Sequence, residues 1–326
     1  MAVADSLNRG VRRRELLGWA FYDFANSGYT TVVLTAVFNA YFVGVVAGGA
    51  SWATFAWTLT LAVSSLIVAA ISPPLGAWAD RTAARKRLLL FTTLGCVVST
   101  ALLSTAGPGT LAIAVALVIV SNVFYCIGES VIASFLPDLA RPDAIGRVSG
   151  WGWGVGYFGG MLSLGLSLAW LLGAPERGAT TAQSVPQTLL ITALVFGLAS
   201  LPTFLLLRER RSPSQANSVQ HNPPNGNAPS AWAQLRSSLG SLALFPDLRQ
   251  LLVCMTLYQA GIAVVIALAA VYAEQQMGFS QTDTMILVFA VNIASALGAF
   301  GLGAVQDRIG HRRALAYTLV GWVAMT

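Results

Sequence analysis

The sequence is short of charged residues. Only 10% of its 326 residues are charged, whereas 56% are hydrophobic and the mean hydropathy is +0.68. A soluble domain carries about 25% charged residues, because charge covers its surface, and intrinsic disorder needs low hydrophobicity with high charge. The composition therefore excludes disorder, argues against a purely soluble fold and predicts a protein whose main solvent is lipid.

Histidine and cysteine are also scarce. The two histidines, His221 and His311, lie in polar segments between hydrophobic runs. Cys96, Cys126 and Cys254 stand far apart, so they form neither a metal-binding nor a redox spacing. No HExxH motif occurs, and no serine can be paired with a histidine inside a hydrophobic run. We therefore predict no enzyme, no metal site and no cofactor.

Long hydrophobic runs take the place of charge. A helix needs about 20 apolar residues to cross the hydrocarbon core, and the runs that meet this length cover residues 17–46, 54–78, 88–106, 110–135, 148–172, 186–207, 249–272 and 284–305. A ninth run begins near Ala314 and has about 13 residues before Thr326, too few to cross. We expect an all-α polytopic membrane protein with eight full spans, and we interpret the partial ninth as the sign of a truncated chain.

The basic residues lie almost entirely on one side of these spans. Of the 19 lysines and arginines, only Arg177 lies in a loop after an odd-numbered span. Positive residues mark the cytoplasmic side, so we expect a cytoplasmic N-terminus. The pI of about 9.6 then reflects topology, and the predicted partner is the lipid bilayer, not nucleic acid. Arginine greatly outnumbers lysine, which we interpret as a GC-rich bacterial source and hence a bacterial plasma membrane.

The composition changes between the sixth and seventh spans. Residues 208–230 read RERRSPSQANSVQHNPPNGNAPS, which predicts a flexible linker. Apolar residues then recur at helical spacing and predict a helix in the membrane interface: Trp232, Leu235, Leu239 and Leu242. We divide the chain into an N-terminal six-helix bundle, a linker with an interfacial helix, and an incomplete C-terminal bundle, at residues 1–207, 208–246 and 247–326.

Two similar segments follow the second and eighth spans: GAWADRTAARKR at 76–87 and GAVQDRIGHRR at 303–313. A duplicated six-helix unit, a known transporter architecture, explains them. They resemble the G-x-x-x-D-R-x-G-x-R-R loop of the major facilitator superfamily, although the first copy has Ala83 and Ala84 where a glycine is usual. WAFYDFANSGYTTVV (19–33) and SFLPDLARPDAIGRVSGWGWGVGYFGG (134–160) further resemble its vacuole-effluxer-like, autophagy-related branch, which includes fungal vacuolar amino-acid exporters. The resemblance implies twelve spans.

The aspartate–arginine clusters in these segments are candidates for a gating latch. A carboxylate at a helix end can be held by its own arginines and by the N-terminus of a neighbouring helix, and such a contact can form in one global state and break in another. The resemblance implies that Asp80 docks near the eleventh span. The alternative is that these charges only set topology and cap local helices. The predicted latch residues are Asp80, Arg81, Arg85, Asp307, Arg308 and Arg312.

Two acidic residues lie inside predicted spans. Asp23 and Glu129 each stand about 10 Å deep, where an ionisable residue is a candidate functional group. The resemblance places both around a central cavity. Apart from Arg249, the first residue of the seventh span, no basic residue lies inside the eight spans, so the cavity suits a proton, a cation or the ammonium of a zwitterion. Burial beside a like charge favours a protonated carboxyl, so we predict proton coupling through one of them. Packing hydrogen bonds, or snorkelling of Asp23 to the interface, are the alternatives.

Polar residues at helical spacing complete the predicted pathway for substrate and protons: Asp23, Asn26, Ser27, Asn122, Tyr125, Glu129, Gln259 and Asn292. We predict a secondary transporter that moves a small polar or zwitterionic solute, with an amino acid as the substrate implied by the resemblance. A channel is less consistent with duplicated halves, which rock around a midplane site. The alternative is a non-transporting membrane scaffold or an inactive truncated product.

Overall fold

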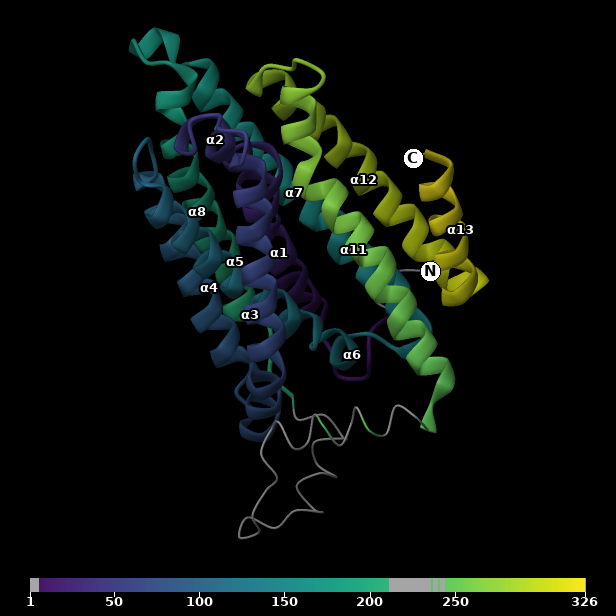
Figure 1. Ribbon diagram of the computed structural model, residues 1–326. Helices are drawn as coiled ribbons and strands as arrows, with labels where there is room; N and C mark the ends of the chain where they lie inside the picture. Colours follow the sequence, from purple (N-terminus) through teal and green to yellow (C-terminus); the bar gives the residue numbers. More distant parts are fainter. Residues whose placement is uncertain (1–5, 211–235, 237–239, 241–243, 326) are drawn as a thin grey trace.

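The protein is a bundle of long helices (Figure 1). The computed structural model describes residues 6–210, 236, 240 and 244–325, without the side chains of Asp80, Arg81, Thr181, Ala267, Ala270, Gln281 and Met325. Eight segments in this part of the chain are long and apolar enough to cross a membrane. The predicted all-α polytopic fold with eight full spans is therefore confirmed.

The helices before the linker form six spans. They are α1 (Arg13–Tyr29) with its continuation to Val46, α3 (Ala53–Thr82), α4 (Arg85–Leu102), α5 (Leu111–Ala133), α7 (Ile145–Leu172) and α8 (Thr181–Leu206). The short helix α6 (Leu136–Leu139) lies between α5 and α7, and the later helices are α11 (Pro246–Gln275), α12 (Gln281–Ile309) and α13 (His311–Met325). The predicted interfacial helix at 232–242 falls almost entirely outside the described residues, and the division into three regions stays a prediction.

The first span is not one regular helix, contrary to the single run expected at 17–46. After α1, a π-helical segment covers Thr30–Ala36, α2 covers Phe38–Tyr41, and a second π-helical segment covers Phe42–Val46. The first of these segments begins with Thr30, Thr31, Val32 and Val33, and β-branched residues lose side-chain freedom in a regular helix. Hydropathy depends only on how apolar the residues are and carries no information on the hydrogen-bond register. It therefore could not predict the change from α-helix to π-helix at Thr30. Such π-helical turns are frequent at functional sites.

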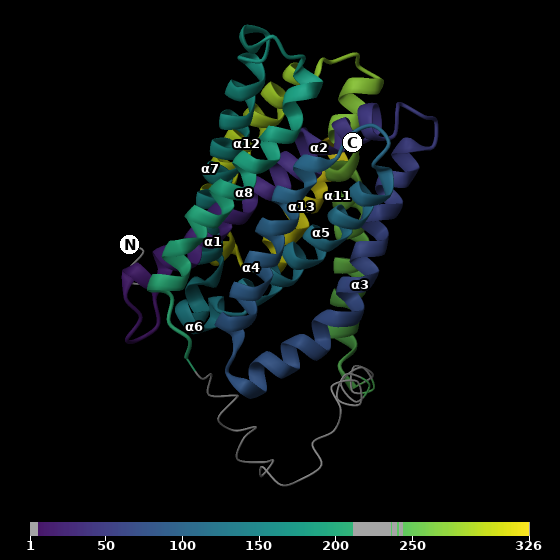
Figure 2. The ribbon, with the colours of Figure 1, turned by 90° about the vertical axis from the view of Figure 1, so that its left-hand side faces the viewer.

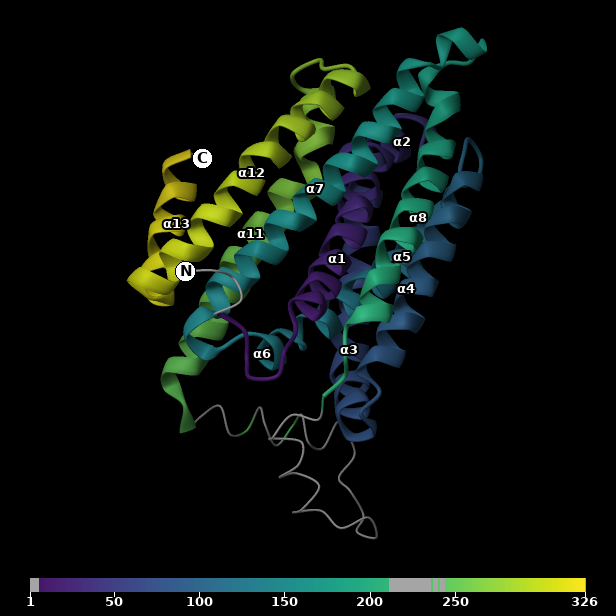
Figure 3. The same ribbon diagram turned by 180° about the vertical axis from the view of Figure 1, so that it is seen from behind.

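Helix α7 joins the two parts of the chain. It packs against α1 and, to a greater extent, against α12, and Figure 3 shows it between α12 on one side and α1 and α8 on the other. The end of α8 and the start of α11 lie at the same end of the molecule (Figure 1), which we call the linker end. The first span lies deepest, since Ala25, Tyr29, Phe38 and Phe42 are fully buried.

Glycine makes the close contacts of α7 possible. A Cβ atom at Gly159 would overlap the carbonyl oxygen of Phe24 in α1. On the other face, a Cβ at Gly150 would lie 2.6 Å from the carbonyl oxygen of Ala299 in α12 and 3.0 Å from Cα of Gly303. Helices can approach this closely only where no side chain intervenes, so the glycines of α7 let it pack against both partners at once.

We expect Gly159→Ala to destabilise the protein by about 3 kcal/mol, because the new methyl group would press on backbone that cannot rotate away. Gly165→Ala on the same helix is the matched control, since its Cβ would meet only Phe289, at 3.7 Å. Thermal unfolding of both purified variants in detergent measures the difference. Equal melting temperatures would show that α1 and α7 do not pack this tightly.

Candidate transport site and gating contacts

A polar cluster joins the first and fourth spans. Nδ2 of Asn26 in α1 donates a hydrogen bond of 2.7 Å to Oε1 of Glu129 in α5. Tyr125, one turn before Glu129, lies close to the same carboxylate, and Asp23 is near enough to interact with it electrostatically. Asn26 is only 3% exposed. Four of the residues predicted for the pathway therefore lie together, inside the bundle.

Asp23 and Ser27 turn toward α7. A Cβ on Gly152 would lie 3.0 Å from Oδ2 of Asp23, and a Cβ on Gly156 would lie 3.0 Å from Oγ of Ser27. Within the described part of the chain, the Asp23 carboxylate has neither a hydrogen bond nor an ion pair. Asp23 is half-buried, and a carboxyl group that is partly shielded from water and has no described partner is costly when charged, so it is suited to taking up a proton or a cation.

Two tyrosines, Tyr29 and Tyr125, border the cluster. The sequence predicted Tyr125 for the pathway but not Tyr29. The ring of Tyr29 stacks on that of Tyr125 with centroids 5.0 Å apart, and its hydroxyl is 2.8 Å from Oγ of Ser121. Tyr29 was missed because it carries no charge and lies in an apolar run. Its position three residues after Asn26, on the same helix face, was the available signal.

Asn122 does not meet the first span. Its Nδ2 donates a hydrogen bond of 2.5 Å to Oγ of Ser64 in α3, and Cys126 Sγ is 3.8 Å from Oδ1 of Asn122. Asn122, Cys126 and Glu129 follow one another along one face of α5, but Asn122 lies two turns before Glu129, where α3 and not α1 packs against that face. Asn122 therefore ties α5 to α3 instead of lining the cluster.

The two predicted residues of the later helices behave differently. Asn292 in α12 is 8% exposed and donates to the carbonyl oxygen of Val288 in its own helix at 2.8 Å. Its Oδ1 lies next to Gly160 of α7, beside Thr31 of the first span, so it stands where three spans meet. Gln259 in α11 is exposed, and no hydrogen bond joins it to another described residue.

At the second copy of the loop motif, Asp307 bridges the two parts of the chain. Its Oδ2 accepts a hydrogen bond of 2.9 Å from the backbone nitrogen of Arg147, and its Oδ1 contacts Gly146. Both residues belong to the first turn of α7, so a carboxylate from α12 caps a helix N-terminus, where unpaired N–H groups and the helix dipole favour negative charge. Arg308 and Arg312 are exposed and have no partner among the described residues.

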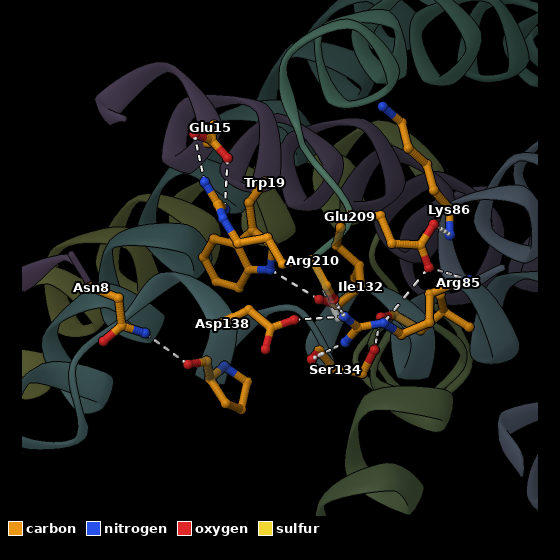
Figure 4. Close-up of polar contacts among 12 residues, drawn as sticks. Asn8, Glu15, Trp19, Arg85, Lys86, Ile132, Ser134, Asp138, Glu209 and Arg210 are labelled. Atoms are coloured by element: carbon orange, nitrogen blue, oxygen red, sulfur yellow. Dashed lines mark hydrogen bonds and ion pairs between the residues drawn. The ribbon is translucent and has the colours of Figure 1, made fainter. Parts of the chain in front are cut away.

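The first copy of the motif is held differently, in a network of charged groups at the linker end (Figure 4). Arg85 donates to Oδ2 of Asp138 at 2.6 Å and to the carbonyl oxygens of Ser134 and Arg210 at 3.0 and 2.9 Å. Its side chain is 6% exposed, and its guanidinium lies 4.5 Å from the ring centre of Phe135. Arg85 thus binds within the N-terminal bundle, while the side chains of Asp80 and Arg81 lie outside the described set.

Residues at the start of the predicted linker complete this network (Figure 4). Glu209 accepts hydrogen bonds from the backbone nitrogens of Arg85 and Lys86, at 2.7 and 3.4 Å, and so caps α4. Arg210 forms an ion pair of 2.7 Å with Glu15 in α1. The composition assigned both residues to the linker, because a polar run reveals no partners. They instead fasten the ends of α1, α4 and α8 together.

Comparisons with known proteins agree with this architecture. Residues 39–147 and 143–326 match the family model described as vacuole effluxer Atg22 like. A relative from Bacillus subtilis (strain 168), described as "Uncharacterized MFS-type transporter YxiO", is 24% identical over 307 residues, which cover 93% of this chain and 70% of the relative. Both descriptions are of transport proteins, not enzymes. The chain therefore belongs to the vacuole effluxer Atg22-like family of MFS-type membrane transporters.

Proposed function

We propose that this transporter moves a small polar or zwitterionic solute, best an amino acid, and that protons drive it. The observation that carries the proposal is the cluster of Asp23, Asn26 and Glu129 between the first and fourth spans, in which Asn26 is buried and the two acids are half-buried. Ionisable groups inside membrane spans mark ion and substrate pathways. Apart from Arg249, the first residue of the seventh span, no lysine, arginine or histidine lies inside the predicted spans, so the cluster offers carboxylates without a fixed cation to neutralise them.

The two carboxyl groups of the cluster have different surroundings. Glu129 is held by Asn26, whereas Asp23 lacks a described partner and faces α7, the helix that contacts α12. The Asp23 carboxylate can be neutralised either by a proton or by the ammonium group of a bound amino acid. When the cavity opens to the opposite side of the membrane, the ligand that is bound can leave and the second ligand can take its place. Exchange of this kind at one carboxylate couples the movement of solute to the movement of protons.

We further propose that the linker end faces the cytoplasm of a bacterial cell, with the N-terminus on the same side. The support is the placement of basic residues. Arg85, Lys86 and Arg210 meet in one network at this end, and Arg147 lies at the start of α7. Cytoplasmic segments are enriched in lysine and arginine.

The contact of Asp307 with the N-terminus of α7 has the geometry of a gate that holds the linker end closed. We expect Asp307→Asn to weaken this cap by about 1 kcal/mol, which increases the population of the open state by about fivefold. In a background with Cys126 as its single cysteine, alkylation of Cys126 from the linker side should accelerate by a similar factor. Asp283→Asn, at the other end of α12, is the control and should leave the rate unchanged, and equal rates in both variants would contradict the gate.

Uptake by the purified protein in proteoliposomes tests the substrate and the coupling. We expect radiolabelled amino acids to accumulate when a proton gradient is imposed, and accumulation to stop when an ionophore collapses the gradient. Protein-free liposomes give the background. The alternative, a non-transporting scaffold or an inactive product, predicts no uptake above that background under any gradient.

A further inference from the structure

A large apolar groove opens between α3, α4 and α5. Its volume is about 770 Å³, and its walls include Ile71 and Trp78 of α3, Phe91 of α4, and Phe124 and Ile127 of α5. Phe91 and Trp78 are 63% and 45% exposed. Side chains this apolar and this exposed, on a membrane-spanning bundle, are in contact with lipid.

The groove arises from a bend in α3. Pro73 and Pro74 lie inside this helix, and proline in a helix interior removes a hydrogen bond and kinks the chain. In Figure 2 the last part of α3 runs obliquely toward the start of α4, with α5 at a deeper level. The upper parts of α3 and α4 are therefore separated, and α5 forms the floor between them.

This groove is distinct from the candidate transport site. The residues of α5 that line it are Val123, Phe124 and Ile127, whereas Glu129 reaches Asn26 in α1. In Figure 2, α3 and α4 face the viewer, and α12 and α13 lie behind the N-terminal bundle. The helices after the linker therefore cover another side of the molecule.

Among the described side chains, one that lines the groove is charged. Arg87 is the third residue of α4 and lies at the linker end of the groove. Its neighbours are engaged inside the bundle, because Arg85 pairs with Asp138 and Nζ of Lys86 donates to the carbonyl oxygen of Leu207 at 2.7 Å. Arg87 itself is exposed and has no acidic partner among the described residues, so its charge is directed to the edge of the groove.

We propose that this groove binds an anionic phospholipid from the leaflet at the linker end. The phosphate group lies on Arg87, and one acyl chain runs along Trp78 and Ile71 over the floor made by α5. From Trp78 to Ile71 the helix rises about 10 Å, which is about two thirds of the hydrocarbon thickness of one leaflet. Basic pockets between membrane helices bind anionic headgroups in this way, and Trp78 has the amphipathic ring that is enriched at the headgroup level.

Quenching of tryptophan fluorescence by brominated lipids tests the proposal. The protein is reconstituted in phosphatidylcholine vesicles that contain either brominated phosphatidylglycerol or brominated phosphatidylcholine, and the difference between wild type and Trp78→Phe isolates the signal of Trp78. One arginine near the surface contributes about fivefold to the binding of an anionic lipid. We therefore expect brominated phosphatidylglycerol to quench Trp78 at about fivefold lower mole fraction than brominated phosphatidylcholine.

Three variants make the test specific to Arg87. Arg87→Gln should abolish the preference for phosphatidylglycerol while both lipids still quench Trp78, and Arg87→Lys should retain it. Arg249→Gln removes another exposed arginine at the linker end and should leave the preference unchanged. Equal quenching by the two lipids in the wild type, a preference that survives in Arg87→Gln, or no quenching of Trp78 would each overturn the proposal.

Discussion

Replacing Arg85 with glutamine is expected to lower the free energy of unfolding by about 3–5 kcal/mol, because it removes the positive charge of an ion pair that is largely shielded from water. The side chains of Arg85 and Asp138 are only 6% and 11% exposed, so water cannot replace the lost ion pair. The carbonyl oxygens of Ser134 and Arg210 would lose their donor as well. For a bundle of this size, the loss corresponds to a fall in melting temperature of roughly 10 °C.

The chain provides a matched control for this substitution. Arg141 forms an ion pair with Asp143 at 3.0 Å, but these side chains are 50% and 64% exposed. Exposed pairs contribute less than about 1 kcal/mol, so Arg141→Gln should hardly change the melting temperature. Arg85→Lys should fall between the two, since it keeps the charge but loses the planar fork. If Arg85→Gln melts together with Arg141→Gln, the network does not stabilise the bundle.

Neutralising the carboxyl groups of the cluster is expected to have the largest effect on transport. Glu129→Gln and Asp23→Asn each remove an interaction with a charged group, which is worth about 1.5–3 kcal/mol. Uptake driven by a proton gradient should therefore fall about tenfold to hundredfold. Glu129→Gln should still exchange labelled for unlabelled solute without a gradient, because it leaves the Asp23 carboxylate in place to bind the ammonium group.

Initial uptake rates measured across a range of external pH distinguish this role from helix packing. A carboxyl group that only packs helices changes the amount of folded protein, whereas one that carries the proton changes how the rate depends on pH. Glu176→Gln is the control, since Glu176 is exposed and lies between the fifth and sixth spans. Unchanged pH dependence in both Asp23→Asn and Glu129→Gln would refute proton transfer at this cluster.

The meeting of Asn26 and Glu129 was accessible from the sequence because both lie at similar depth in adjacent spans. Depth follows from counting residues at 1.5 Å per residue, and a polar side chain inside a membrane span turns toward the protein interior. The same argument did not reveal the partner of Asn122, which donates a hydrogen bond to Ser64 of α3. Counting gives the height of a residue in the membrane, but not which helix stands opposite it.

The charged residues at the linker end also show that the sequence does not reveal which residues will be partners in the fold. The repeated motif predicted the same kind of latch in both copies, with Arg85 in the first copy and Asp307 in the second. In the structure, Asp307 caps the start of α7, while Arg85 binds Asp138 and is joined by Glu209. Neither Asp138 nor Glu209 carries a periodic or compositional signal, because a partner brought near by folding leaves no trace in the local sequence.

The sequence by itself determined the eight spans, the polar break after the sixth and the duplication of the loop motif. Each of these is a local property, since the transfer of an apolar run into lipid depends on that run alone. Only the tertiary structure decided that Asp23 faces α7 with no partner in the part of the chain that is described, that the first span breaks at Thr30 and that the prolines of α3 open a groove beside Arg87. These features depend on how closely helices approach one another, which is set by packing between segments far apart in the chain.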